Sequence, residues 1–202
     1  MTAAETIQWR GRRVLVTGHT GFKGSWLVQA LARAGAEVTG YSLPPPTSPS
    51  LFEAAGVAAL LHRHVGGDVR DADRLAAEVA RARPEALFHL AAQPLVRRGH
   101  RDPVETFSTN VTGTAAVLDA VRRADLPCAV IVVTSDKCYE PRRDGAPHGE
   151  GDPLGGHDPY AASKACAELV TAAMRRGHFP PEALPRHGVQ VATVRAGNVV
   201  GG

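Results

Sequence analysis

The sequence predicts an α/β protein built on a doubly wound, parallel sheet of the Rossmann type. Two observations predict it: short β-branched runs alternate with amphipathic stretches, and a glycine-rich turn joins the first run to an apolar helical stretch. With 202 residues, 44% of them hydrophobic, the chain can bury one substantial core. We therefore expect one domain over residues 1–202. Because the chain stops in a glycine-rich turn after the last predicted strand, we also expect a smaller substrate lobe after residue 202.

The predicted strands are runs rich in Val, Ile, Leu and Ala that stand between polar or glycine-rich breaks. VLVT before Gly18 is the first, and AVIVVT before Ser135 is the fifth. In chain order the six predicted strands cover residues 13–17, 37–41, 61–65, 86–90, 129–134 and 190–194.

Helices are predicted where apolar residues recur at helical spacing between those runs, at 22–34, 72–82, 104–124 and 159–175. Asp158 and Pro159 suit the N-cap and first position of the last helix. Two polar segments interrupt the alternation, 43–50 (LPPPTSPS) and 140–158. The second is longer than an α/β connection needs, and we expect it to border the substrate.

Composition excludes several classes of protein. The net charge is only +3, from 23 basic and 20 acidic residues, so the chain has no basic patch suited to nucleic acid. No apolar run approaches the roughly 20 residues of a membrane-spanning helix, and the apolar stretch near the N-terminus is too short for a signal peptide. Three cysteines without CxxC spacing suggest neither a disulfide framework nor a metal site. We expect a cytoplasmic protein with no membrane or nucleic-acid partner, whose Cys128, Cys138 and Cys166 are reduced and partly buried.

Lysine is rare in this chain. Of the 23 basic residues only Lys23, Lys137 and Lys164 are lysine. A lysine kept against a strong preference for arginine suggests a place that needs a compact ammonium group or an amine able to lose its proton. Chance placement is the alternative.

A G-x-x-G-x-x-G pattern follows the first predicted strand, and a helix follows the pattern. Gly18 suits the tight turn, Gly21 permits close approach of a pyrophosphate to the helix N-terminus, and Gly24 permits close helix packing. Lys23 is within reach of the phosphates. This context predicts dinucleotide binding, with Thr20 and Phe22 in the same loop.

The adenosine end of that site lacks its usual acidic residue. After the second strand the chain reads Gly-Tyr-Ser-Leu, with neither a carboxylate for the ribose hydroxyls nor an arginine for a 2′-phosphate. Ser42 either contacts the ribose or only opens the proline-rich loop. Asp68 and Val69 suit the adenine, although Asp68 equally suits a turn or a helix cap. Small residues after the fourth strand, Leu90, Ala91 and Ala92, let a cofactor cross the strand ends.

Tyr160 and Lys164 form the predicted reactive centre. At positions i and i+4 of one helix they share a face. An ammonium group beside a phenol lowers the phenol pKa, so Tyr160 suits removal of a proton from a sugar hydroxyl during oxidation.

These motifs together resemble the extended short-chain dehydrogenase/reductase family over the whole chain. Four segments, GHTGFKGSWL at 18–27, TSDKCYE at 134–140, DPLGGHDPY at 152–160 and RAGNVVGG at 195–202, look like its CDP-glucose 4,6-dehydratase branch. The resemblance implies NAD as cofactor and a nucleotide-sugar substrate. It also implies oxidation at C4, loss of water across C5 and C6, reduction at C6, and assembly as a homodimer or homotetramer.

The resemblance also assigns residue roles. Ser135 would bind the C4 oxygen, Asp136 would protonate the leaving C6 hydroxyl, and Lys137 would replace the glutamate base of related dehydratases, which requires a neutral amine of lowered pKa. Gln93, Arg195 and Asn198 would contact the substrate. We expect these 202 residues by themselves to bind cofactor without turning over sugar.

Two other functions stay open. A nucleotide-sugar 4-epimerase shares the glycine loop, Tyr160 and Lys164 but needs no acid and base after the fifth strand. A non-catalytic sensor of NAD(H) would need neither Tyr160 nor Lys164.

Four further residues are assigned to structure. His62 and His64 are predicted to form a solvated pair, because no third metal ligand has suitable spacing. Trp26 is predicted to be core. Asn110 is predicted to bridge its helix to the sheet.

Overall fold

The computed structural model describes residues 8–142 and 144–200, and it contains the predicted Rossmann-type sheet. Six parallel strands stand in the order β3-β2-β1-β4-β5-β6, which is that of a dinucleotide-binding fold. The strands are β1 (Arg13–Thr17), β2 (Glu37–Ser42), β3 (Arg63–Gly66), β4 (Ala86–His89), β5 (Cys128–Val133) and β6 (Val189–Val194). Each predicted strand is confirmed to within two residues. Gly201 and Gly202, predicted to end the last motif, lie outside the described residues, as do residues 1–7.

The four predicted helices are present, and one of them differs in form. The helices are α1 (Phe22–Arg33), α2 (Leu51–Ala54), α3 (Ala72–Ala82), α4 (Val96–Arg101), α5 (Pro103–Phe107), α6 (Gly113–Ala124), α7 (Pro159–Gly177) and α8 (Leu184–His187). A π-helical segment, Ser108–Thr112, joins α5 to α6, so the helix predicted at 104–124 is not uniformly α-helical. The sequence analysis missed α2, α4 and α8, which are too short to show a full hydrophobic period.

One face of the sheet is fully packed. Leu15, Leu87 and Val130 stand side by side on neighbouring strands and are buried under α3 and α6. Helix α7 covers the same face beside α6 and against β6. This layer fixes the position of α7, which carries the predicted reactive residues.

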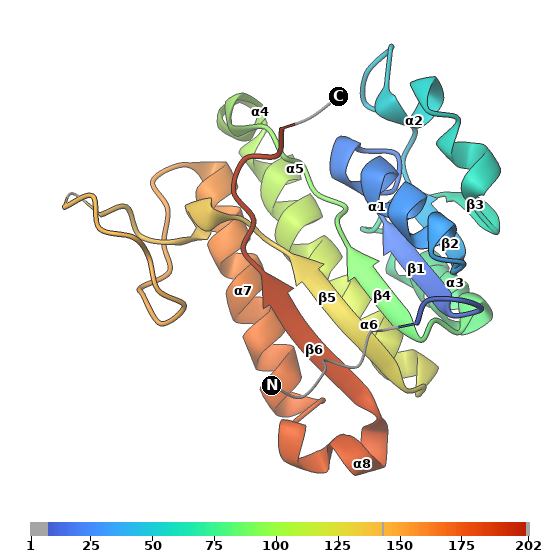
Figure 1. Cartoon of the computed structure of the whole chain (residues 1–202). Helices are drawn as coiled ribbons and strands as arrows, with labels where there is room; N and C mark the ends of the chain where they lie inside the picture. Colours follow the sequence, from blue (N-terminus) through green and yellow to red (C-terminus); the bar gives the residue numbers. More distant parts are fainter. Residues whose placement is uncertain (1–7, 143, 201–202) are drawn as a thin grey trace, which may run out of the picture.

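The opposite face is covered at one end. Helix α1 packs on β1 and β2, whereas Figure 1 shows β5 and β6 facing the viewer with no helix over them. The next row of side chains, Phe88 and Ile131, is therefore only half-buried. Together with α1 they line a cavity of about 590 Å³.

Trp26 borders this cavity, so its assignment to the core is wrong. Its side chain is 40% exposed, because α1 turns it toward the uncovered end of the sheet and not toward β1.

The long segment between β5 and α7 extends away from the sheet (Figure 1). An isolated bridge between Tyr139 and Leu154 closes it at its base. Within the described part of the chain, no helix combines the length and apolar character needed to cross a membrane.

Candidate active site

The glycine loop is built by backbone sterics. Gly18 has φ +76°, a conformation that favours glycine, and a Cβ there would lie 2.6 Å from the Ala91 amide nitrogen. A Cβ on Gly24 would lie 2.2 Å from the Gly18 carbonyl oxygen. Gly21 differs, because its nearest neighbour would be 3.4 Å away. Packing therefore requires Gly18 and Gly24, whereas Gly21 leaves an open backbone surface.

The first turn of α1 suits a pyrophosphate. Gly21 occupies the N-cap, and no side chain caps the turn. The free N–H groups and the positive end of the helix dipole thus point to the place where phosphates bind in such folds. Lys23 lies in this turn, and burial lowers the pKa of its amine. A dinucleotide fits this cradle.

Ser42 and Thr20 meet at the end of β2. Their hydroxyl oxygens are 2.9 Å apart, and the Thr20 hydroxyl also donates to the Leu43 carbonyl at 2.9 Å. Both side chains are buried. Ser42 therefore joins the glycine loop to β2, and both hydroxyls lie at the predicted ribose end.

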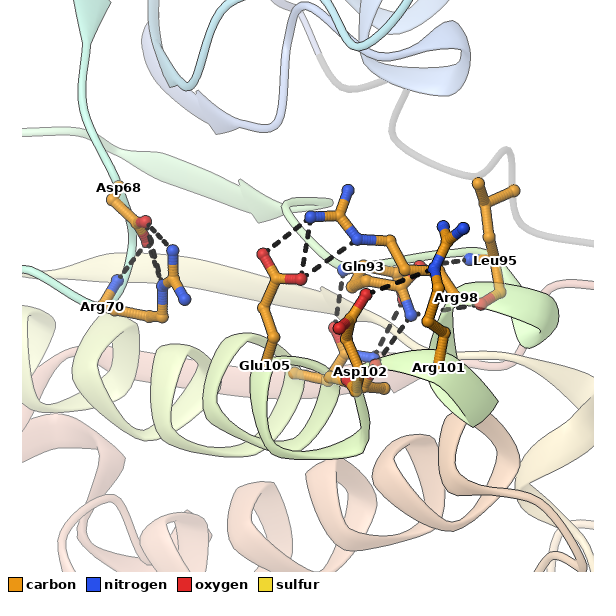
Figure 2. Close-up of polar contacts among 10 residues, drawn as sticks. Asp68, Arg70, Gln93, Leu95, Arg98, Arg101, Asp102 and Glu105 are labelled. Atoms are coloured by element: carbon orange, nitrogen blue, oxygen red, sulfur yellow. Dashed lines mark hydrogen bonds and ion pairs between the residues drawn. The ribbon is translucent and has the colours of Figure 1, made fainter.

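Asp68 is engaged by Arg70. Arg70 Nε lies 3.0 and 2.9 Å from the two carboxylate oxygens, and the hydrogen bonds from Arg70 lower the Asp68 pKa. Figure 2 shows this ion pair next to a second one, between Arg98 and Glu105. Asp71, and not Asp68, caps α3. The Asp68 carboxylate is thus held in a turn beside the predicted adenine position.

Gln93 is bound within the protein. Its side-chain amide donates to the Leu95 carbonyl at 3.1 Å and to Thr106 Oγ1 at 2.8 Å, and it accepts from the Leu95 N–H at 2.7 Å (Figure 2). Asn110 holds both backbone groups of Gln93 and also donates to Ser163 Oγ at 2.8 Å. Asn110 therefore joins its helical segment to the connection after β4 and to α7, and not directly to a strand of the sheet as predicted. Gln93 shapes that connection.

Tyr160 and Lys164 lie on the first turns of α7. Asp158 caps this helix, accepting from the Tyr160 and Ala161 N–H groups, and Pro159 is the first helical residue, as predicted. Lys164 is only 7% exposed, and its amine donates to the Val133 carbonyl at 3.1 Å. Burial and the nearby Lys23 lower its pKa to about 8. Two of the three lysines therefore lie close together.

The Tyr160 pKa differs in direction from the sequence prediction. Burial raises it, the nearby Ser135 hydroxyl offsets part of this rise, and the carboxylate of Asp136 adds to it. The Lys164 amine is directed to the Val133 carbonyl, which explains why it does not dominate the phenol. The two residues are nevertheless one helical turn apart on α7.

Ser135, Asp136 and Lys137 follow β5 in a short 3₁₀ turn. Ser135 caps the turn, accepting from the Lys137 N–H at 3.2 Å and donating to the Asp136 carboxylate at 3.1 Å. The Asp136 carboxylate lies near Gly197, where a Cβ would be 3.4 Å from Oδ2. Asp136 and Lys137 are exposed, so both are open to a ligand from solvent.

Arg195 and Asn198 follow β6 and differ in environment. Asn198 is exposed, whereas Arg195 is bound to Glu168 of α7 and to Tyr139. Glu168 was missed by the sequence analysis. A signal was available, because Tyr160, Lys164 and Glu168 repeat at four-residue spacing, which is one face of a helix.

The two histidines near β3 correct another prediction. His64 does not pair with His62: its Nδ1 lies 2.7 Å from Nε2 of buried His19 in the glycine loop. His62 precedes β3 and is exposed. Burial and the neighbouring His64 lower the His19 pKa to about 4, so the His19 ring is held neutral, and its contact with His64 links the glycine loop to β3.

Comparison with known proteins places this geometry in a family. A model described as the NAD dependent epimerase/dehydratase family matches residues 14–202. CDP-glucose 4,6-dehydratase of Salmonella typhimurium is 51% identical over 194 residues, covering 96% of this chain and 54% of that protein. UDP-glucose 4-epimerase of Mycolicibacterium smegmatis is 35% identical over 158 residues, covering 78% of this chain and 49% of the relative.

Solved structures agree in fold. The double mutant of DesIV, a dTDP-glucose 4,6-dehydratase from Streptomyces venezuelae with NAD and DAU bound, matches with TM-score 0.76 and 30% identity, covering 91% of this chain and 55% of that one. UDP-glucose 4-epimerase from Brucella ovis in complex with NAD matches with TM-score 0.73 and 28% identity over 93% of this chain and 52% of that one. The chain spans about half the length of the curated relatives it matches. With its Rossmann sheet, glycine loop and Tyr160–Lys164 helix, the chain belongs to the NAD dependent epimerase/dehydratase family.

Proposed function

We propose that this chain carries the cofactor site and the reacting residues of a CDP-glucose 4,6-dehydratase. The observation that carries the proposal is the placement of Tyr160 and Lys164 on α7 beside the Ser135–Lys137 turn, in a chain 51% identical to such an enzyme. The domain assignment of residues 1–202, with a substrate lobe following, is part of the same proposal.

NAD would be held across the strand ends, and when bound it accepts electrons from the sugar and returns them. Gly18, Gly21, Phe22 and Gly24 would provide the loop and helix N-terminus for the pyrophosphate, with Lys23 beside it. Thr20 and Ser42 would face the ribose, and Asp68 and Val69 the adenine. Leu90, Ala91, Ala92, Tyr160 and Lys164 would border the nicotinamide.

The chain's own residues divide the reaction into two parts. Tyr160 takes the proton of the C4 hydroxyl during oxidation, with the Ser135 hydroxyl lowering the cost of the phenolate and Lys164 one helical turn away. Asp136 then protonates the leaving C6 hydroxyl while Lys137 removes the C5 proton, so water is lost across C5 and C6. Ser135 holds the C4 oxygen. Asn198 and Arg195 border the sugar in this proposal. Arg195 does so indirectly, by holding the segment around Tyr139, to which it is bound.

A 4-epimerase is the nearest rival, and one relative has that name. Epimerisation needs a single oxidation and reduction at C4 and no group that protonates a leaving hydroxyl. Asp136 lies beside Ser135 with its carboxylate exposed, which favours the dehydratase. A non-catalytic sensor would not need Tyr160 and Lys164 at four-residue spacing on α7.

Product analysis tests the proposal. The full-length protein is incubated with CDP-glucose and NAD, and the products are separated by mass. We expect a product lighter than the substrate by one water, carrying a keto group, and we expect Tyr160→Phe to abolish it. Conversion to an isomer of unchanged mass would instead identify an epimerase. No conversion of CDP-glucose by a wild type that still binds NADH would favour the sensor.

Assembly and location complete the proposal. Val104 of α5 is 81% exposed and Leu169 of α7 is 59% exposed, on two helices that pack together. A second copy covering them would give the homodimer or homotetramer, which sedimentation of the wild type against Leu169→Arg tests. Free thiols at Cys128, Cys138 and Cys166 support a cytoplasmic location.

A further inference from the structure

Glu168 of α7, which forms an ion pair with Arg195 at the end of β6, has no part in the reaction described so far. Arg195 Nη2 lies 2.9 Å from Glu168 Oε2. Glu168 is buried and stands four residues after Lys164, on the same face of α7. The carboxylate is therefore one helical turn behind the proposed oxidising pair.

Glu168 binds three donors from two strand ends. The Thr134 hydroxyl donates to Oε1 at 2.5 Å, and the Thr193 hydroxyl donates to Oε2 at 3.0 Å. Burial alone would raise the Glu168 pKa, but the hydrogen bonds from Arg195, Thr134 and Thr193 outweigh it and hold the pKa below its ordinary value. The ionised carboxylate fixes the residue directly before Ser135.

Arg195 reaches the other side of the same turn. Its Nη1 donates to the Tyr139 hydroxyl at 2.8 Å and to the Glu150 carbonyl at 2.9 Å, and the guanidinium lies 4.8 Å from the Tyr139 ring centre. The next residue, Ala196, accepts the Asp136 N–H at 3.1 Å. Residues before, within and after the Ser135–Lys137 turn are thus tied to one ion pair, of which the carboxylate is buried.

We propose that Glu168 and Arg195 are positioning residues, which hold the Ser135–Lys137 turn in register with Tyr160 and Lys164. This inference rests on the proposed function, because it assigns oxidation to α7 and elimination to the turn. The two parts of the reaction act on adjacent carbons of one sugar, so the two elements must keep a fixed separation. A displacement of about 1 Å costs on the order of 10²-fold in rate.

Amide hydrogen exchange of the full-length protein tests the clamp without substrate. We expect Glu168→Gln to speed exchange of the Asp136 amide about tenfold or more, with Arg195→Lys intermediate because it keeps the charge but has fewer donors. The matched control is Glu78→Gln, which breaks another partly buried Arg–Glu pair, with Arg63, at the opposite edge of the sheet beside β3. That variant should leave Asp136 exchange unchanged.

The two half-reactions supply the second readout. With CDP-glucose and NAD, Glu168→Gln should slow elimination about 10²-fold and C4 oxidation less than about tenfold, so reduced cofactor and a 4-keto hexose accumulate. Arg195→Lys should restore part of the elimination rate. If Glu168→Gln unfolds, the double variant Glu168→Gln/Arg195→Met removes the unpaired buried charge and is measured in its place.

The outcomes separate this inference from the proposed function. Equal slowing of both steps, together with unchanged Asp136 exchange, would overturn the positioning role. Absence of any dehydration by the wild type would instead overturn the proposed function, and Asp136 exchange would still decide whether the clamp exists.

Discussion

The glycine loop and the β5–α7 region both lie at the carboxyl ends of the strands, but they are held in place in different ways. Around Gly18 and Gly24 the backbone itself leaves no room for a Cβ. Around Ser135 and Lys164 the geometry depends on side chains, namely the Asp158 cap, the Lys164 bond to a strand carbonyl and the Glu168–Arg195 pair.

This difference predicts how each region responds to substitution. A change at Gly18 or Gly24 meets rigid backbone atoms and should damage folding and cofactor binding together. A change in the β5–α7 region removes a charge or a hydrogen bond and should damage one chemical step while the cofactor still binds.

The largest effect is expected at Lys137. Because its side chain is exposed, Lys137→Ala should leave stability and NADH affinity unchanged. It should lower the rate of elimination by about 10²–10⁴-fold, or about 3–5 kcal/mol, the usual loss on removing a general base. The measurement is exchange of the C5 hydrogen with solvent alongside C4 oxidation. Equal C5 exchange in wild type and variant would remove Lys137 from this role.

Lys164 should make stability depend on pH. Its pKa is about 8 in the folded chain against an ordinary value of 10.5. Between these two values the unfolded chain binds more protons, so the free energy of unfolding rises with pH, by up to about 3 kcal/mol in total. Below pH 8 the destabilisation that comes from burying the charged amine is at its maximum, and above pH 10.5 it is absent.

Denaturant unfolding at a series of pH values measures this slope. The difference between wild type and Lys164→Met isolates the contribution of this amine, because both proteins share every other titrating group. A difference that stays constant from pH 8 to pH 10.5 would show that the amine is not held in a dry site.

Two glycines of the loop form a matched pair. Gly24→Ala places a Cβ 2.2 Å from the Gly18 oxygen and should destabilise the protein by about 1–3 kcal/mol through overpacking. Gly21→Ala meets nothing closer than 3.4 Å, so it should leave the melting temperature unchanged and weaken NADH binding. Thermal unfolding and NADH fluorescence titration distinguish them. Equal destabilisation by both would mean that packing, and not ligand approach, explains Gly21.

The smallest effect concerns the 2′-phosphate that distinguishes NADPH from NADH. We expect NADH to bind more tightly than NADPH by less than about tenfold, or about 1.4 kcal/mol. No carboxylate stands with Ser42 at the end of β2 to repel a 2′-phosphate. Arg70, which follows β3, is paired with Asp68, and Arg63, at the start of β3, is paired with Glu78. Parallel titrations decide it, and tighter binding of NADPH would show that one of these arginines leaves its carboxylate.

The sequence was sufficient to predict what depends on local pattern. Strand and helix positions follow hydrophobic period, and the α7 start follows Asp158 and Pro159, because capping acts within three residues. Helices as short as α4 do not show enough of the hydrophobic periodicity to be recognised from the sequence.

Contacts between distant residues were not predictable in the same way. The partners of Arg195 and His64 come from elsewhere in the chain, Glu168 and His19, and only the sheet order brings them together. Trp26 was assigned to the core because an apolar helix position usually faces one, yet α1 covers only part of the sheet.

The most direct test follows one hydrogen through the reaction. The full-length protein is given CDP-glucose labelled with deuterium at C4, with NAD in ordinary water, and the product is examined by mass spectrometry and NMR. The account predicts loss of one water, transfer of the deuterium to C6 and a solvent hydrogen at C5. Deuterium retained at C4 in an isomer of unchanged mass would contradict it.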